Sequence, residues 1–492
     1  MKKLTFLISL FSILVSHFAV SANPQALFLK AKKTKTKTPI KHLVVIIPEN
    51  RSFDHLFGTY PNALNRPGEP KFKAKRNTPT INGLSTAILN HNTNSSPPFR
   101  LSRSQVVTIE PAHHYTQVQE AVHAGLLDQF VQVNGGDRTP MGYFDGNTVT
   151  ALWNYAQRFA MNDNCFSTTM TPSSPGHINL VSGLTHGVIP ANLILSTGEV
   201  VVVDGTLIGD PDPAFDVCSV PPTVELTGKN VGDLLNAKNV TWGYFQGGFR
   251  NCSKTHVGSK GVAVPDYSPH HQPFQYYRST SNPNHQPPSS TDMIGYQDKA
   301  NHQYDIKDFW AAVKNHNIPS VSFIKPPEYQ DGHPKYSDQL LLQTFLVKTL
   351  NRLQLISEWK HMAVIIIWDD AGGWYDHVMP PIINQSHVPP DALLGPGDAG
   401  NPPPGAYQGR LAYGMRLPFL LISRYAKSNY VDHSLIDQTS VLKFIEYNWG
   451  LGSIGDQSFD AVAGSLKNMF NFYRPKKKLL LLDPETGLKR KF

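Results

Sequence analysis

The sequence predicts an α/β fold with a mostly parallel central sheet, helices on both faces and long loop insertions. Residues 364–368 and 43–47 are short, unbroken apolar runs rich in β-branched residues, the pattern of strands that helices cover on both faces. A long helical segment, 340–359, leads directly into the first of these runs. The 39 prolines and 36 glycines fall largely in connecting segments, which indicates long loops around one core.

Further elements follow along the chain. The other predicted strands are 165–170, 240–246, 320–325 and 417–423. The other predicted helices are an amphipathic segment ending at Leu127, 151–160, a segment beginning at Ile178, 232–238, 306–315 and 440–448. Length alone suggests about three domains. We expect a single one, because the candidate site residues are spread from near the start to the last third of the chain.

The first 22 residues differ in composition from the rest. They contain Lys2 and Lys3, an apolar stretch and a small-residue site at Val20-Ser21-Ala22, as a secretory signal peptide does. We therefore expect an exported bacterial protein, periplasmic or secreted. The predicted organisation is a signal peptide at 1–22, a basic segment at 23–40, one domain at 41–474 and a basic tail at 475–492.

Positive charge is concentrated near the two ends. The formal net charge is +8, and it falls to +6 without Lys2 and Lys3. Residues 30–41 contribute six lysines and no acid, and residues 474–492 have seven basic residues against two acids, which leaves the body near −5. A groove that follows a nucleic acid backbone is therefore not expected. The basic ends could favour transient contact with an anionic membrane surface, although most such runs are merely solvated.

Three cysteines allow at most one internal disulfide. Cys218 and Cys252 lie in loop-like, Pro-rich or polar surroundings, and export permits oxidation, so this pair is the expected bond. Cys165 is then expected to be a buried free thiol. No CxxC or Cys/His spacing indicates a structural zinc site.

Polar side chains follow two of the buried strands where each strand ends. Glu49 and Asn50 come after the first strand, and Asp369 and Asp370 come after the strand at 364–368. Ligands of open α/β sheets bind at the carboxyl ends of strands, so these side chains are expected at one edge. Three carboxylates meeting there would need a metal ion. Taken separately, Glu49 could cap the next turn, and the two aspartates could lie in a solvated loop.

Ser173 and Ser174 lie just before a predicted helix, in the segment PSSPGH. A serine in this position has its oxygen near unpaired backbone amides, which is a good place for a phosphate. Ser-Ser-Pro is also an ordinary helix cap. The residues alone leave both interpretations open.

Several motifs in fixed order resemble one known family. They run from Lys41 to Gly450 and are VVIIPENRSFDHLFG, EPAHHY, TPSSPGHINLVSG, HHQPFQYY, DGHPKYSD, IIIWDDAGGWYDHVMPP and DQTSVLKFIEYNWG. The set is similar to the bacterial phosphoesterase family of phospholipases C and acid phosphatases, within the alkaline-phosphatase superfamily. The resemblance implies an alkaline-phosphatase-like fold and a catalytic role for the domain at 41–474.

The resemblance also implies roles for individual residues. One divalent metal ion would be bound by Glu49, Asn50, Ser173, Asp369 and Asp370. Ser173 would be the nucleophile, with Ser174 as the neighbour that could be mistaken for it. The histidines that match those around the phosphate in the family are His113, His271, His333 and His377. We leave His177, His186 and His433 as structural.

Two positions depart from the family pattern. Asp370 stands where many relatives have Glu, which shortens one ligand arm and leaves the metal preference open. Gln438 stands where His is frequent, and this change is expected to matter little. An oxygen-rich set suits Mg²⁺, Ca²⁺ or Mn²⁺, whereas the superfamily resemblance favours Zn²⁺, which we prefer.

The implied chemistry is nucleophilic attack on phosphorus with a phosphoserine intermediate. The first hypothesis is a phospholipase C that cleaves phospholipids into diacylglycerol and a phosphorylated head group. The second is a broad-specificity acid phosphatase acting on phosphate monoesters. A third is a phospholipid- or metal-binding surface protein without turnover, against which the intact serine and acids argue. Aromatic segments 274–277 and 374–375 could admit the acyl-glycerol or could equally belong to the core.

Overall fold

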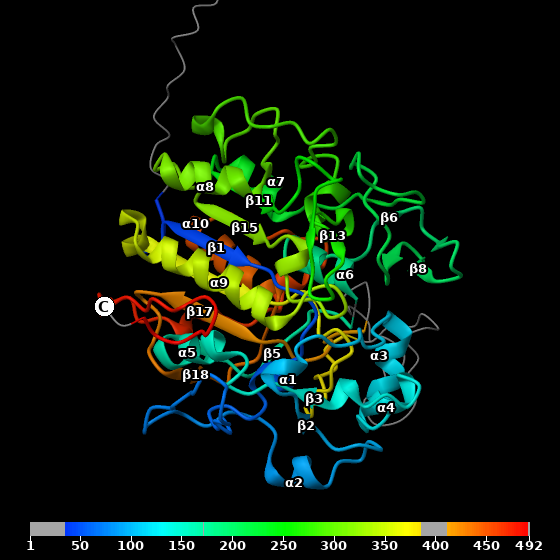
Figure 1. Ribbon diagram of the computed structural model, residues 1–492. Helices are drawn as coiled ribbons and strands as arrows, with labels where there is room; N and C mark the ends of the chain where they lie inside the picture. The colour runs from blue at the N-terminus through cyan, green and yellow to red at the C-terminus, as the bar shows by residue number, and fades with distance from the viewer. Residues whose placement is uncertain (1–34, 171, 385–410, 491–492) are drawn as a thin grey trace, which may run out of the picture. The chain divides into compact units, whose positions relative to one another are not determined.

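Eight strands form the central sheet, in the spatial order β14-β11-β15-β1-β16-β17-β4-β18 (Figure 1). The structure is a computed structural model that describes residues 35–170, 172–384 and 411–490, so the predicted signal peptide lies outside it. In sheet order the strands are Gln303–Asp305, Trp242–Gln246, Val321–Lys325, His42–Ile46, Met362–Ile367, Phe419–Ser423, Ala160–Asn162 and Tyr430–Asp432.

The middle of the sheet is parallel, as predicted. β1 pairs in parallel with β15 on one side and β16 on the other, so that Ile46 lies opposite Ile324 and Ile366. β17 runs antiparallel to both of its neighbours, β16 and β4. A buried strand has the same apolar run in either direction, so the sequence pattern does not reveal this reversal.

Helices cover both faces of the sheet, with α9 in front of it and α10 behind it in the view of Figure 1. The helices α1 to α10 are Phe53–Phe57, Thr86–Asn90, Tyr115–Val122, Phe130–Val133, Thr150–Arg158, Ser173–Asn179, Val231–Ala237, Ile306–Lys314, Gln339–Gln354 and Thr439–Trp449. Asp338 caps α9 by accepting hydrogen bonds from the amides of Leu340 and Leu341. None of the helices in the described residues is long and apolar enough to cross a membrane.

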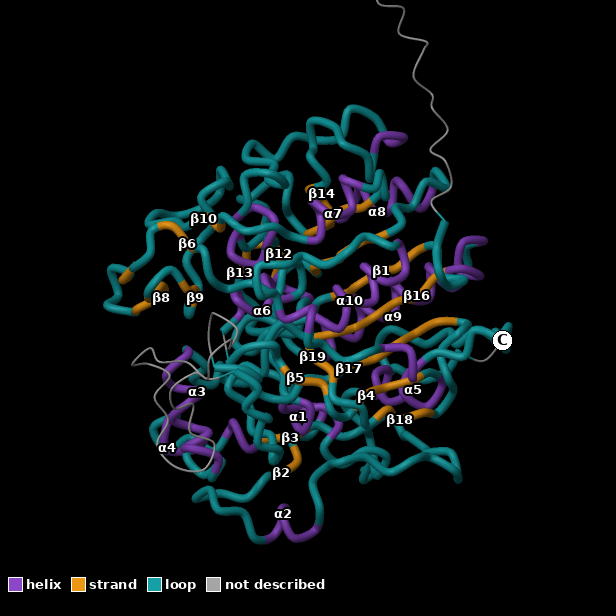
Figure 2. The backbone as a smooth tube through the Cα atoms, turned by 180° about the vertical axis from the view of Figure 1, so that it is seen from behind, coloured by secondary structure: helices purple, strands orange, loops and turns teal. Residues whose placement is uncertain are grey.

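Small sheets form in the long loop insertions. Four of them are pairs: β2 (Phe99–Arg100) with β3 (Gly142–Tyr143), β5 (Cys165–Phe166) with β19 (Ile436–Asp437), β6 (Val188–Ile189) with β10 (Glu225–Leu226), and β12 (Thr255–Val257) with β13 (Ala263–Pro265). The fifth has three strands, in which β8 (Val200–Val203) lies between β7 (Leu193–Ile194) and β9 (Thr206–Leu207). β6, β8 and β13 lie to the right of the central sheet in Figure 1 and to its left in the reverse view (Figure 2). This is the side toward which the β1 and β15 arrows point.

Five segments differ from their predictions. The helices predicted to end at 127 and 359 end at Val122 and Gln354. The strand predicted at 165–170 pairs only over Cys165–Phe166, and the helix predicted from Ile178 begins five residues earlier, at Ser173. The basic C-terminal segment is not a solvated tail throughout, because Leu482 is fully buried and its carbonyl oxygen accepts a hydrogen bond from Asn351 of α9 at 2.7 Å. Apolar side chains within that basic segment account for its packing.

Candidate active site

The carboxyl ends of β1 and β16 bring the predicted acids together. These strands are parallel neighbours, so Glu49 and Asn50 after β1 lie beside Asp369 and Asp370 after β16. The backbone amide of Asn50, a residue with φ of +53°, donates to Asp369 Oδ1 at 2.9 Å. All four side chains are buried, as expected for a site at the edge of a parallel sheet.

Ser173 is the first residue of α6 and reaches into this group. Its Oγ lies 3.2 Å from Asn50 Oδ1, 3.2 Å from Asp370 Oδ2 and 3.4 Å from Glu49 Oε2. A Cβ on Gly176 would lie 2.2 Å from the carbonyl oxygen of Asp369, so only glycine lets the helix approach the strand end this closely. The structure thus brings together the serine and the four side chains that the sequence analysis grouped.

The two carboxylate oxygens of Glu49 face different partners. Oε1 lies 2.8 Å from His177 Nε2, 3.1 Å from Lys325 Nζ and 3.6 Å from His271 Nδ1, whereas Oε2 faces Ser173. Burial acts to raise the pKa of Glu49, but the positive charge of Lys325 and the hydrogen bond with His177 outweigh it and hold that pKa well below its usual value. Glu49 is therefore ionised, with one oxygen held by the protein and the other directed at the serine.

The side-chain amide of Asn50 fits in two orientations. In one, its oxygen faces Ser173 and the acids while its nitrogen lies 3.1 Å from His113 Nε2. In the other, its nitrogen donates to Glu49 Oε2 at 2.8 Å and its oxygen accepts from His333 Nε2 at 3.0 Å. An amide oxygen among carboxylates is favourable when a cation lies between them. The first orientation therefore suits a metal-bound site, and the second suits the same site without metal.

Lys325 pairs with Glu49, whereas no lysine or arginine in the described ranges pairs with Asp369 or Asp370. Burial, followed by the charge of Glu49, raises the pKa of Asp369 well above its usual value. Burial likewise raises the pKa of Asp370 to about 7. Converging oxygens with such raised pKa values fit a divalent cation, because its charge stabilises the ionised carboxylates. Glu49, Asn50, Ser173, Asp369 and Asp370 could therefore hold a metal ion.

Residues 40–452 match the model of the Phosphoesterase family. The chain belongs to this family. Phospholipase C A of Mycobacterium tuberculosis is 25% identical over 454 residues, which cover 89% of this chain and 78% of the relative. The non-hemolytic phospholipase C of Burkholderia pseudomallei is 24% identical over 478 residues, which cover 90% of this chain and 61% of the relative. This phosphoesterase is accordingly a phosphoric ester hydrolase, and its substrate is a phosphoester.

Among solved structures, a protein in the alkaline phosphatase superfamily from Vibrio parahaemolyticus matches this chain. It covers 91% of this chain and 72% of its own, with 12% identity and a TM-score of 0.33. Murine ectonucleotide pyrophosphatase/phosphodiesterase 5 covers 66% of this chain and 95% of its own, with 11% identity and a TM-score of 0.31. Likeness at this level carries no weight for function, and the α/β architecture of the phosphoesterase rests on its own sheet.

Three of the four predicted phosphate histidines lie at the site. His271 approaches Glu49, and His113 and His333 both reach the amide of Asn50. Burial lowers the pKa of His333 to about 4 and that of His271 well below its usual value, so both rings are neutral at pH 7. The fourth, His377, differs, because its Nδ1 lies 2.6 Å from Asp54 Oδ2 and its Nε2 lies 3.0 Å from Asn82 Oδ1.

Sequence reasoning missed two residues that contact Glu49. Lys325 is the last residue of β15 and is fully buried, in the same position as the acids that end β1 and β16. A charged residue at the end of a buried strand was the available signal. His177 follows Ser173 by four residues, one turn of α6, and therefore faces the same side. From the sequence we expect a structural role for His177, because a histidine taken singly is more often structural.

Gln438 has a larger structural role than expected. It is fully buried, and its side-chain nitrogen donates to the carbonyl oxygens of Asp369 and of Trp368, the latter at 3.2 Å. Its side-chain oxygen accepts from the amide of Thr168 at 3.1 Å. Gln438 therefore supports the backbone that presents Asp369 to the site.

Two further expectations concern residues away from the acids. His186 and His433, for which we expect structural roles, lie 3.4 Å from Asp456 and 2.8 Å from Asp163 respectively. The aromatic segments at 274–277 and 374–375 are buried, so they belong to the core and offer no open surface to an acyl chain. Any lipid-facing surface must come from other residues.

Proposed function

We propose that this phosphoesterase is an exported, metal-dependent phospholipase C that acts through a phosphoserine intermediate. The observation that carries the proposal is the position of Ser173 Oγ, within 3.4 Å of oxygens from Glu49, Asn50 and Asp370. The names of the relatives support phospholipids as the substrate. The disulfide between Cys218 and Cys252 supports export, because such bonds persist in oxidising compartments.

The residues of the chain divide the reaction between them. Ser173 Oγ forms a bond to phosphorus and displaces the glycerol oxygen, which leaves as diacylglycerol, and water then releases the phosphorylated head group from the serine. A histidine at the site can take up the serine proton and deliver it to the leaving oxygen, and His113, His271 and His333 are the candidates. A bound divalent cation would supply positive charge that lowers the pKa of the serine hydroxyl and stabilises the phosphate.

The proposed ion is Zn²⁺, held by Glu49, Asn50, Ser173, Asp369 and Asp370. The donors are all oxygen atoms, which Ca²⁺, Mg²⁺ and Mn²⁺ also accept, so metal analysis of the purified protein decides between these ions. A protein that contains no stoichiometric divalent ion and is not stimulated by any of the four would reject metal dependence.

One experiment tests the substrate and the mechanism together. Hydrolysis of phosphatidylcholine, phosphatidylglycerol and p-nitrophenyl phosphate is compared for the wild type and Ser173→Ala, with and without chelator. We expect lipid hydrolysis that Ser173→Ala abolishes and that chelator removes reversibly. Turnover of the monoester alone would instead establish the acid phosphatase, and no turnover by metal-loaded wild type would support a binding protein.

A further inference from the structure

A two-stranded ribbon in the described residues exposes an apolar face. β12 and β13 pair antiparallel, and the side chains on the outward face, all exposed, are Thr255, Val257, Ala263 and Pro265. Val264 on the opposite face is buried, and Val257 is 65% exposed. The solvated face of an antiparallel pair ordinarily carries polar residues. An outward face made largely of apolar residues therefore indicates contact with a partner.

Positive charge accompanies this ribbon. Val262, in the turn between the strands, is 56% exposed, and Lys260 beside it is exposed as well. Two nearby cations are neutralised, because Lys254 pairs with Asp266 at 3.2 Å and Arg250 pairs with Asp308. Within the described residues, Lys260 forms no ion pair, so it is the cation that the ribbon offers to a partner. Apolar side chains with a lysine at their margin match the chemistry of a phospholipid surface, where the aliphatic groups enter the head-group region and the lysine meets a phosphate.

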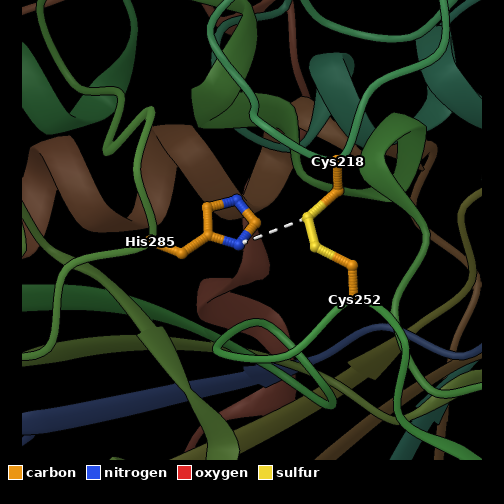
Figure 3. Close-up of side chains that lie close together, drawn as sticks. All are labelled: Cys218, Cys252 and His285. Carbon is orange, nitrogen blue, oxygen red and sulfur yellow. Dashed lines mark hydrogen bonds between the residues drawn. A yellow bond between two sulfur atoms is a disulfide. The ribbon is translucent and has the colours of Figure 1, made fainter.

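A second exposed apolar segment is covalently joined to the ribbon. The exposed residues of segment 211–222 are Ala214, Val217, Val220, Pro221 and Pro222, none of them charged. The disulfide between Cys218 of this segment and Cys252 links it to the chain just before β12, with 6.1 Å between the two Cα atoms (Figure 3). His285 Nδ1 lies 3.6 Å from Cys218 Sγ on one side of this bond (Figure 3). The disulfide therefore holds the two segments next to each other, and we call them together the apolar rim (residues 211–222 and 251–265).

Both parts of the apolar rim are anchored beside the site. Asp210, directly before the first segment, accepts a hydrogen bond from the amide of Ser174 at 2.7 Å. In the second segment, the amide of Ser259 donates to the carbonyl oxygen of Tyr336 at 3.0 Å. The Tyr336 ring stacks on His333 with centroids 4.3 Å apart. The rim is thus tied to the neighbour of the nucleophile and to a histidine of the site.

We propose that the apolar rim docks this phosphoesterase on a phospholipid surface and presents the phosphodiester to Ser173. The inference rests on the proposed phospholipase function and names the surface through which it meets its substrate. Valine, alanine and proline dominate the exposed positions of the rim, whereas protein interfaces concentrate binding energy in tryptophan, tyrosine and arginine. The composition therefore favours a lipid surface over a protein partner.

Two double variants test the proposal, Val257→Asp/Val262→Asp and Val217→Asp/Val220→Asp. The matched control is Leu355→Asp, because Leu355 is 66% exposed at the end of α9 that leads into β16, at the opposite edge of the sheet from the site. Co-sedimentation with phosphatidylcholine/phosphatidylglycerol vesicles is measured in a Ser173→Ala background, so that no lipid is consumed. Hydrolysis of p-nitrophenylphosphorylcholine, a soluble diester, is measured with Ser173 present.

Each double variant should lose about tenfold or more in vesicle binding, since two valines no longer leave water on docking. Soluble ester hydrolysis and the Leu355→Asp control should stay within about twofold of the parent. Vesicle binding equal to the parent would overturn the proposal. The proposal would also be overturned if the Ser173→Ala parent did not sediment with vesicles while the protein with Ser173 hydrolysed the soluble ester. That result would leave the proposed function intact. A self-association of the parent that both double variants abolish would identify a protein contact instead.

A gain-of-signal measurement covers the case in which a double variant does not fold. The single variant Val262→Trp should show fluorescence quenching by brominated phospholipid vesicles, and Leu355→Trp should not. Equal quenching of the two proteins, or of neither, would also overturn docking through the rim.

Discussion

Two buried groups of acidic side chains lie on the same pair of loops, and they differ in what neutralises them. After β1 and β16 the chain first presents Glu49, Asp369 and Asp370, and a few residues later it presents Asp54 and Asp376. Arg416 lies between the later pair, with Nη2 donating to Asp54 Oδ1 at 3.0 Å and Nε donating to Asp376 Oδ1 at 3.1 Å. The later group therefore carries its own counter-charge.

The earlier group is neutralised only in part. Within the ranges that the structure describes, Lys325 pairs with Glu49, but no lysine or arginine forms an ion pair with Asp369 or Asp370. Burying carboxylates without a partner is costly, whereas a buried arginine with all its donors satisfied closes a network. The comparison teaches that one group is a structural clamp that fixes the loops, whereas Asp369 and Asp370 of the other group can take their counter-charge from a bound cation. Four predictions test this difference between the two groups.

The largest effect is expected from Ser173→Ala. Removing the proposed nucleophile should lower kcat/KM by about 10⁴-fold, because the proposed covalent route is lost, with a change in unfolding free energy below about 1 kcal/mol. Steady-state kinetics and urea denaturation check the two parts. Ser174→Ala is the matched control, since its hydroxyl is adjacent but outside the group of acids, and it should retain most activity. The reverse pattern would move the nucleophile to Ser174.

Arg416→Met should lower the stability of the protein and leave its catalytic activity largely unchanged. It leaves Asp54 and Asp376 buried without a cation, and we expect the unfolding free energy to fall by about 3–5 kcal/mol. Urea denaturation at pH 7.5 measures the loss, and kcat per folded molecule should change far less. Adding Asp376→Asn should restore part of the stability. A variant as stable as wild type would refute the clamp.

Chelator should destabilise the protein in a pH-dependent way. The pKa of Asp370 is raised to about 7 in the metal-free fold, above its unfolded value, so the stability it contributes is present at low pH and is lost as pH rises through 7. A bound cation compensates this loss, so chelator should cost about 2 kcal/mol more at pH 8 than at pH 5. Calorimetric Tm values with and without chelator give the difference. The Arg416→Met destabilisation should not depend on chelator.

The smallest effect is expected from Gly176→Ala. The added Cβ would collide with the carbonyl oxygen of Asp369, so α6 must shift and carry Ser173 away from the acids. We expect kcat to fall by about tenfold to 100-fold, and the unfolding free energy to fall by about 1–2 kcal/mol. Gly228→Ala is the control, because its nearest neighbour is the flexible end of Leu184 at 3.2 Å. Equal kinetics for the two variants would mean that α6 tolerates the shift.

Much of the site was predictable because polar residues directly follow strands that the sequence marks as unbroken apolar runs. The apolar runs before Glu49 and Asp369 gave both the strands and the edge where their carboxyl ends meet, and the family motifs added Ser173. Lys325 obeyed the same rule and was overlooked. His177 depended on where α6 begins, and local propensity places a helix boundary poorly because capping and packing decide it.

Other features had no signal near them in the chain. Arg416 joins Asp54 and Asp376 from outside both loops, and the apolar rim requires the Cys218–Cys252 bond together with the knowledge of which ribbon face is exposed. Side-chain direction on a ribbon follows from its packing, so exposed and buried valines look alike in a sequence.

The sequence by itself determined the parallel core, the family and the residue types at the ends of β1 and β16, because hydrophobic periodicity and fixed motifs are local properties. The tertiary structure alone decided the antiparallel direction of β17 and which acids pair with a lysine or arginine. It also decided that His377 contacts Asp54 of the clamp and that His177 contacts Glu49. Those features depend on contacts between residues far apart in the chain, where packing determines which side chains meet.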